Sequence, residues 1–334
     1  MTNKRHWAAL ALCLVVAGQA WAQSPAQIQK ALDDAHGRYA SLQEGKNADY
    51  IPALAKVDAK LFGIVLVSTD GKVYSRGDVG ALFSIQSISK VFTLARVIQD
   101  SGPQAVLEKV GVDATGQVFN SIVAIEQNKG KEMNPFVNPG AIATTSMVQG
   151  ATADEKWARI IGAYEDFAGR KLEVNQEVYK SESETNERNR AIATLLHAYD
   201  RLYDDPLRAT DLYTRQCSVN VSARDLAVMA ATLANGGKNP LTARQVVTPG
   251  TIPYVLAVMA TAGLYDDSGI WLYDVGLPAK SGVGGGIIAV APGRFGIAVF
   301  SPPLDPAGNS VRAQKAIRDI VTALKANPYA VLPR

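Results

Sequence analysis

The sequence predicts a mixed α/β protein of the α+β kind, in which one antiparallel sheet is built from both ends of the mature chain. Strand-like apolar runs occur near residues 62–75 and again near 286–301, whereas residues 87–262 are mainly helical in pattern. We therefore expect one domain over residues 23–334, with terminal helices flanking the sheet and a mainly helical subdomain beside it. The sheet part would comprise about residues 23–82 and 272–334, and the helical part about residues 83–271.

Residues 1–22 have the features of a secretory signal peptide in the expected order. Lys4 and Arg5 form a positive start, residues 7–16 an apolar stretch too short for a stable membrane span, and residues 20–22 an Ala-x-Ala cleavage site. The alternative is a buried N-terminal helix. We expect an exported chain, periplasmic in a Gram-negative source, that begins at Gln23. No later apolar run is long enough to span a membrane, so we expect no stable membrane insertion.

Local patterns predict the elements that follow the signal. Residues 25–45 have helical spacing, and residues 62–68, 69–71 and 72–75 indicate a strand, a turn and a second strand. The clearest helix of the middle region begins near Thr185 or Asn186. Its apolar side is expected to carry Ile192, Leu195, Leu196, Tyr199 and Leu202.

The C-terminal end predicts a hairpin and a helix. Residues 286–291 and 295–301 are strand-like runs on either side of Pro292-Gly293, a turn dipeptide. A helix is expected from about Ser310 to Ala326. Pairing this hairpin with the N-terminal strands gives the single sheet.

Charge and composition exclude several classes of function. Removing residues 1–22 removes Lys4 and Arg5 and no acidic residue, which lowers the formal net charge from +3 to +1. Such a charge gives no argument for nucleic-acid binding. Cys217 would be the single cysteine of the mature chain, so an intramolecular disulfide is impossible. Only His36 and His197 remain, which excludes a three-histidine metal site, and we expect His197 to be structural.

Two short motifs indicate a catalytic site. Residues 87–90 read Ser-x-x-Lys and residues 280–282 read Lys-Ser-Gly, the two outer motifs of serine hydrolases built around a Ser/Lys pair. If Ser87 opens a helix, Lys90 lies one turn on, on the same face. A desolvated lysine can be neutral and accept a proton. Alone, Ser-x-x-Lys is more often the N-terminus of a helix with a solvated lysine, but its apolar flanks and the second motif favour a buried catalytic pair.

The surroundings of these motifs extend the pattern to five blocks in order. They are FSIQSISK at 83–90, NPFVNPGAI at 134–142, TNERNR at 185–190, QCS at 216–218 and GLPAKSGVGGG at 276–286. In these blocks the chain resembles the serine-dependent glutaminases, which have the fold of β-lactamases and penicillin-binding proteins. The resemblance extends from about Tyr50 to Pro302.

The resemblance implies hydrolysis of L-glutamine to L-glutamate and ammonia, without a metal or an organic cofactor. It also implies a homodimer or homotetramer, because family members commonly form them. Ser87 matches the nucleophile and Lys90 its partner. The matching substrate contacts are Tyr50, Asn138, Glu182, Asn189, Tyr213, Tyr265 and the backbone of Val283.

The chemistry of amide hydrolysis suggests a role for each matched group. Ser87 would attack, Lys90 would take its proton, and Tyr265 would relay a proton to the departing ammonia. The backbone N–H groups of Ser87 and Val283 would form the oxyanion hole, and the glycines after Val283 allow a close approach to substrate.

The two charged ends of free glutamine need partners as well. We expect Glu182 to pair with the α-ammonium, and Asn138, Asn189 and Tyr50 to bind the carboxylate or the amide. Glu184, Glu187 and Arg188 are instead expected to form an ordinary charged helix start.

The chain departs from the family at Pro139, where an alanine is more common, and this residue could shift the backbone after Asn138. Two other functions stay open at this point. One is an exported β-lactamase or D-alanyl-D-alanine peptidase, although the Ser-Asp-Asn motif is missing and Ser218-Val219-Asn220 is read as a turn. The other is a non-catalytic glutamine-binding protein, which would not need Ser87 and Lys90.

Overall fold

The computed structural model describes residues 23–129 and 133–331, and the proposed signal at 1–22 lies outside them. A five-stranded antiparallel sheet has the order β2-β1-β7-β6-β5. Its strands are β1 (Gly63–Ser68), β2 (Val73–Gly77), β5 (Ala279–Gly282), β6 (Gly286–Ala291) and β7 (Phe295–Phe300). Strand β1 pairs with β7 from Gly63 opposite Phe300 to Ser68 opposite Phe295. The expected α+β fold with a sheet built from both chain ends is confirmed.

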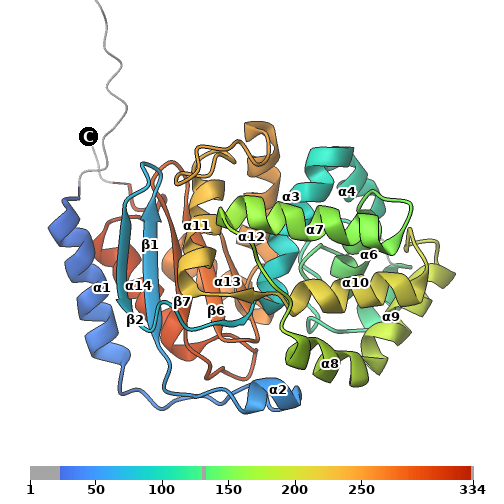
Figure 1. The fold of residues 1–334 in the computed structure, drawn as a ribbon, viewed down its shortest axis with the longest axis horizontal. Helices are drawn as coiled ribbons and strands as arrows, with labels where there is room; N and C mark the ends of the chain where they lie inside the picture. Colours follow the sequence, from blue (N-terminus) through green and yellow to red (C-terminus); the bar gives the residue numbers. More distant parts are fainter. Residues whose placement is uncertain (1–22, 130–132, 332–334) are drawn as a thin grey trace, which may run out of the picture.

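Helices cover both faces of this sheet because its central strands are apolar on both sides. Ile64 and Leu66 of β1 belong to the cluster formed with α1 (Pro25–Tyr39), α13 (Ser268–Val275) and α14 (Val311–Ala323). Val65 and Val67 face the opposite way and pack with α11 (Ala223–Ala234). Figure 1 shows α1 and α14 on one side of the strands and α11 on the other.

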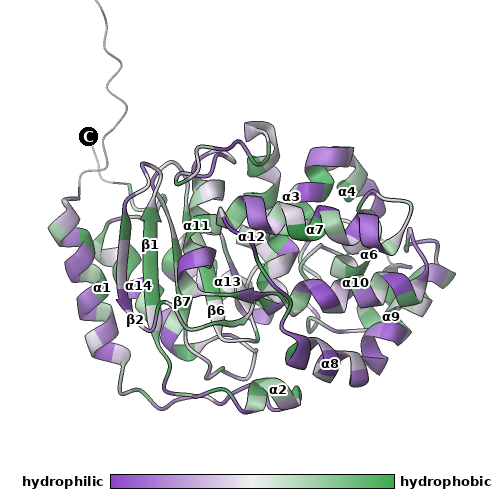
Figure 2. Cartoon of the chain, viewed as in Figure 1, coloured by the Kyte–Doolittle hydropathy of each residue, from purple (hydrophilic) through white to green (hydrophobic). Residues whose placement is uncertain are grey.

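The remaining helices form a second region beside the sheet (Figure 1). They are α2 (Pro52–Ala55), α3 (Ser89–Ser101), α4 (Pro103–Lys109), α5 (Val123–Asn128), α6 (Asn138–Ser146), α7 (Ala153–Ala168), α8 (Gln176–Glu184), α9 (Glu187–Ala198), α10 (Pro206–Cys217) and α12 (Ile252–Ala262). Figure 2 shows a difference in hydropathy between the two regions: β1 is hydrophobic along its length, whereas the peripheral α8 is largely hydrophilic. Within the described ranges, no helix combines the length and apolarity needed to cross a bilayer.

Several predicted boundaries need correction. The first helix ends at Tyr39, well before residue 45, and α9 ends at Ala198, so that Leu202 lies beyond it. Asn220 is not in a simple turn, because it begins β4 (Asn220–Val221), which pairs with β3 (Phe83–Ser84). The predicted C-terminal hairpin and helix are confirmed as β6, β7 and α14.

Candidate active site

Ser87 lies at the junction of the sheet region and the helical region. It belongs to a 3-10 helix, Gln86–Ile88, that leads directly into α3, so it precedes the α-helix instead of opening it. Strand β3 comes just before, and its neighbour Ile85 donates a backbone hydrogen bond to Val219 at 2.8 Å. Gln86 has a φ of 51°, a left-handed conformation that is unfavourable for a residue with a side chain. Backbone strain of this kind is common at functional sites.

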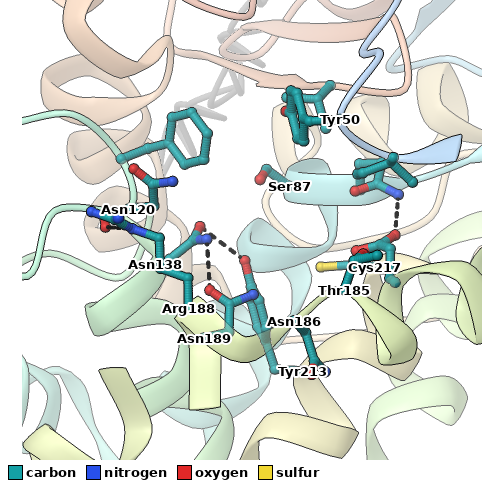
Figure 3. Close-up of a pocket in the computed structure, with 15 residues that line it drawn as sticks. Tyr50, Ser87, Asn120, Asn138, Thr185, Asn186, Arg188, Asn189, Tyr213 and Cys217 are labelled. Atoms are coloured by element: carbon teal, nitrogen blue, oxygen red, sulfur yellow. Dashed lines mark hydrogen bonds between the residues drawn. The ribbon is translucent and has the colours of Figure 1, made fainter. Parts of the chain in front are cut away.

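A cavity of about 340 Å³ opens above Ser87. Its wall contains seven of the nine residues predicted from the sequence, drawn from segments far apart in the chain (Figure 3). They are Tyr50, Ser87, Asn138, Glu182, Asn189, Tyr213 and Val283. Lys90 lies buried behind this wall, and Tyr265 lies beside it, in contact with the cluster that contains Val283.

Lys90 is 1% exposed and has two hydrogen-bond acceptors. Its Nζ donates to the carbonyl oxygen of Phe136 at 3.0 Å and to Oδ1 of Asn138 at 2.8 Å. Among the described groups these acceptors, and not Ser87, hold the amine in place. Burial lowers the pKa of Lys90 to about 7, because desolvation disfavours the ammonium form. A substantial fraction of the amine is therefore neutral near neutral pH.

Asn138 links Lys90 to the substrate cavity. Its Oδ1 also accepts a hydrogen bond from the Tyr213 hydroxyl at 3.0 Å, and its Nδ2 donates to Oδ1 of Asn189 at 3.1 Å (Figure 3). Pro139 does not disturb this arrangement, since it occupies the first turn of α6, where a proline needs no N–H partner. Asn138 is thus fixed by three side chains before any substrate binds.

Glu182, near the end of α8, lines the same cavity as these amides. Its Oε1 accepts a hydrogen bond of 2.6 Å from Nε2 of Gln86, which also donates to Oγ of Ser84 at 3.1 Å. Burial raises the pKa of Glu182 to about 7, and the hydrogen bond from Gln86 only partly opposes this. An unpaired carboxylate in such a setting is suited to receive a cationic group.

Tyr265 is held at the edge of the site by a 3-10 helix and by ring contacts. Its ring lies 5.0 Å, centroid to centroid, from that of Phe119, and its hydroxyl donates to the carbonyl oxygen of Ser281 at 3.4 Å. Burial raises the pKa of Tyr265 to about 12, although hydrogen bonding to Ser87 and Ser281 opposes the shift. The phenol therefore stays protonated, donates a hydrogen bond to the Ser281 carbonyl and can accept a hydrogen bond from Ser87.

The backbone N–H groups of Ser87 and Val283 have no acceptor within the described ranges. Val283 belongs to the turn between β5 and β6 and lines the same cavity as Ser87. Two free N–H donors beside a serine hydroxyl are what an oxyanion hole requires.

The structure adds residues that sequence reasoning missed. Gln86 and Asn120 line the cavity, and so does Arg188, whose Nε donates to the carbonyl oxygen of Asn120 at 2.9 Å. Arg188 is exposed in the first turn of α9, as expected for a charged helix start, and it borders the cavity as well. Cys217 also borders the cavity, but burial raises the pKa of its thiol to about 12, so it is not a reactive nucleophile.

The two histidines lie outside this cavity. His36 stacks on Phe62 with ring centroids 4.7 Å apart, and His197 is exposed in the last turn of α9. In the part of the chain that the structure describes, no three or more His, Cys, Asp or Glu residues are grouped so that they could hold a metal ion.

Comparisons with known proteins agree on one family. The model of the Glutaminase family matches residues 45–329. The chain is 58% identical to a glutaminase of Colwellia psychrerythraea over 310 residues, which cover 92% of this chain and all of that protein. It is 52% identical to a glutaminase of Mycobacterium ulcerans over 308 residues, which cover 92% of this chain and 96% of that one. The solved structure of a probable glutaminase, ybaS, superposes with a TM-score of 0.91 at 48% identity and covers 92% of this chain and 100% of its own.

Proposed function

Because the chain belongs to the glutaminase family and hydrolyses L-glutamine to L-glutamate and ammonia, we propose a mechanism in which Ser87 is the nucleophile and Lys90 its general base. The observation that carries this proposal is the position of Ser87. Its hydroxyl borders the cavity, and a buried amine with a pKa of about 7 lies one turn further along the chain. Val283, whose backbone N–H is free like that of Ser87, lines the same cavity.

The first half of the reaction forms an ester on the serine. Oγ of Ser87 attacks the side-chain amide carbon while its proton passes to Nζ of Lys90. The amide oxygen becomes an oxyanion that the two backbone N–H groups stabilise. When the C–N bond breaks, the Tyr265 hydroxyl protonates the leaving ammonia and regains its proton from Lys90. Water then attacks the ester with Lys90 again as base, the bond between the acyl carbon and Oγ of Ser87 breaks, Ser87 regains its proton from Lys90, and L-glutamate leaves.

The cavity wall complements the two charged ends of a free amino acid. We assign the α-ammonium to Glu182, which has no cationic side chain among its hydrogen-bond partners. Asn189 and Tyr50 would bind the α-carboxylate together with Asn138. Tyr213 contributes by holding Asn138 through the 3.0 Å hydrogen bond.

The direct test is glutamine turnover by purified residues 23–334 beside the Ser87→Ala variant. We expect ammonia and glutamate in equal amounts from the unmodified chain, and a loss of at least about 10³-fold in kcat from the variant, because covalent catalysis is removed. Full activity of Ser87→Ala would refute the assignment of the nucleophile. A chromogenic β-lactam serves as the control substrate.

The same assay separates the other two functions that the sequence leaves open. Cleavage of the β-lactam without glutamine turnover would indicate a β-lactamase or peptidase. Binding of glutamine without turnover would indicate a binding protein. The family match over residues 45–329 supports neither of them.

We also propose that the chain is exported and assembles into a homodimer or homotetramer. Export is supported by the charged start, the apolar stretch and the Ala-x-Ala site of residues 1–22. Assembly is supported by α13, which exposes Ile270 to 65% and Tyr273 to 89%. N-terminal sequencing of the chain from a periplasmic extract should begin at Gln23, and light scattering should give two or four times the monomer mass.

A further inference from the structure

A second lysine is buried close to the site but does not line the cavity. Lys280, on the edge strand β5, has 0% exposure. Burying a lysine without an acidic partner is costly, so the interactions that such a residue makes are informative.

The amine of Lys280 connects the two segments that hold Tyr265. Its Nζ donates to the carbonyl oxygen of Gly263 at 2.9 Å and to that of Ser281 at 2.7 Å. The Ser281 carbonyl also accepts the Tyr265 hydroxyl, and the amine lies 4.3 Å from the centroid of the Tyr265 ring. One amine therefore contacts the backbone before Tyr265, the face of its ring and the acceptor of its hydroxyl.

The Tyr265 segment needs such support because its backbone is strained. Tyr265 has a φ of 52°, in the left-handed region, within a 3-10 helix of only three residues. The chain reaches this turn through Gly263, where an added Cβ would lie 1.8 Å from the carbonyl oxygen of Ala279. Ser281 further donates its N–H to the Gly263 carbonyl at 3.2 Å. The turn is thus pressed directly against β5.

We propose that Lys280 is a positioning residue that holds the Tyr265 hydroxyl at Ser87 through its hydrogen bonds to the Gly263 and Ser281 carbonyls. The proposal rests on the proposed role of Tyr265 in proton transfer. The two hydrogen bonds are available to the amine in either protonation state, since both forms carry at least two N–H groups. Without them Tyr265 can relax from its strained conformation, and a displacement of about 1 Å can cost about 100-fold in rate.

The experiment is a double-mutant cycle of Lys280→Met and Tyr265→Phe, with kcat and KM for L-glutamine measured at one pH together with Tm. Methionine fills a similar volume but donates no hydrogen bond. We expect Lys280→Met to lose about 100-fold in kcat with KM changed by less than about threefold. The double variant should then be less than about threefold below Tyr265→Phe alone, because both changes remove the same contribution.

The proposal would be overturned if the losses of kcat in the two single variants multiplied in the double variant. It would also be overturned if Lys280→Met kept more than about a third of the normal kcat. These results differ from a failure of the proposed mechanism, in which Tyr265→Phe itself would keep full activity. If Lys280→Met does not fold, Lys280→Leu, which also donates no hydrogen bond, takes its place in the same cycle under the same criteria.

Lys156 provides the matched control. It is another buried lysine, in α7, whose Nζ donates to the carbonyl oxygen of Ser146 at 2.9 Å and pairs with Asp204, and it does not line the cavity. Lys156→Met should lower Tm while leaving kcat within about twofold at a temperature at which the protein is folded. An equal loss of kcat in Lys156→Met would show that the effect at Lys280 is a general consequence of removing a buried lysine, and would overturn the proposal.

Discussion

An acidic and a basic side chain of this site, Glu182 and Lys90, have about the same pKa because both are buried. Burial raises the pKa of the Glu182 carboxyl to about 7 and lowers that of the Lys90 amine to about 7. In the proposed mechanism the Glu182 carboxyl and the Lys90 amine must both be deprotonated in the free enzyme. Lowering the pH through 7 protonates both groups and so depletes the active form. We predict that log kcat/KM falls with a slope approaching two below this pH, as a pH profile of initial rates can show. A slope of one throughout would mean that only one of them matters.

The Glu182→Gln variant tests how much of the slope of log kcat/KM against pH comes from Glu182 and how much from Lys90. Removing the carboxylate should reduce the slope to one and raise KM, with kcat/KM about 10- to 100-fold lower above pH 7, the usual cost of a lost charged hydrogen bond. Glu184→Gln is the matched control, since Glu184 is exposed on the same helix and should leave the profile unchanged. An unchanged KM in Glu182→Gln would rule out the ammonium role.

The site was predictable from sequence to the extent that its residues lie in recognisable blocks. Glu182 and Asn138 could be placed by resemblance, and the structure brings them to one cavity. Gln86 and Arg188 could not, although both lie in or next to those blocks. Their side chains reach the cavity because of a left-handed φ at Gln86 and a hydrogen bond from Arg188 to Asn120, and neither feature has a local sequence pattern.

Among the helices and strands, hydrophobic periodicity predicted the longer regular elements and missed the short strands. The hairpin of β6 and β7 was predictable because two apolar runs flank a Pro-Gly turn. Strand β5 was not, because Ala-Lys-Ser-Gly has no apolar alternation and becomes a strand only by pairing with β6. The same is true of β4, whose two residues depend on β3.

The sheet and α11 are in close backbone contact at Gly296. A Cβ added to Gly296 on β7 would lie 2.1 Å from the backbone nitrogen of Ala231, so the helix or the strand would have to move. We predict that Gly296→Ala lowers the free energy of unfolding by about 1–3 kcal/mol or more, the range for an overpacked core, as measured by urea denaturation.

Gly80→Ala is the control for that change, because Gly80 has open space around its Cβ position and no positive φ. Its unfolding midpoint should stay close to that of the unmodified chain. If Gly296→Ala had the same midpoint as Gly80→Ala, the contact of β7 with α11 would not limit stability.

For the whole molecule, the sheet makes the two ends of the chain interdependent. Strand β1 depends on β7 for pairing, and α11 covers β1, β6 and β7 together. The main hydrophobic cluster continues without interruption from Val65 and Phe300 in the sheet to Phe92 and Phe167 in the helical region. Because the two regions share this cluster, unfolding of either one exposes core residues of the other, and we therefore expect them to unfold together.

Residues 23–334 contain two tryptophans that can report on this cooperativity. Trp157, in α7, packs against the main cluster, and Trp271, in α13, belongs to the cluster on the other face of the sheet. Trp157→Phe and Trp271→Phe each leave one reporter. In each variant we predict that the urea midpoint from tryptophan fluorescence equals the midpoint from far-ultraviolet circular dichroism. A fluorescence transition of Trp157 at clearly lower urea than the loss of secondary structure would show that the helical region unfolds first. The active site, which lies between the two regions, would then be lost before the sheet.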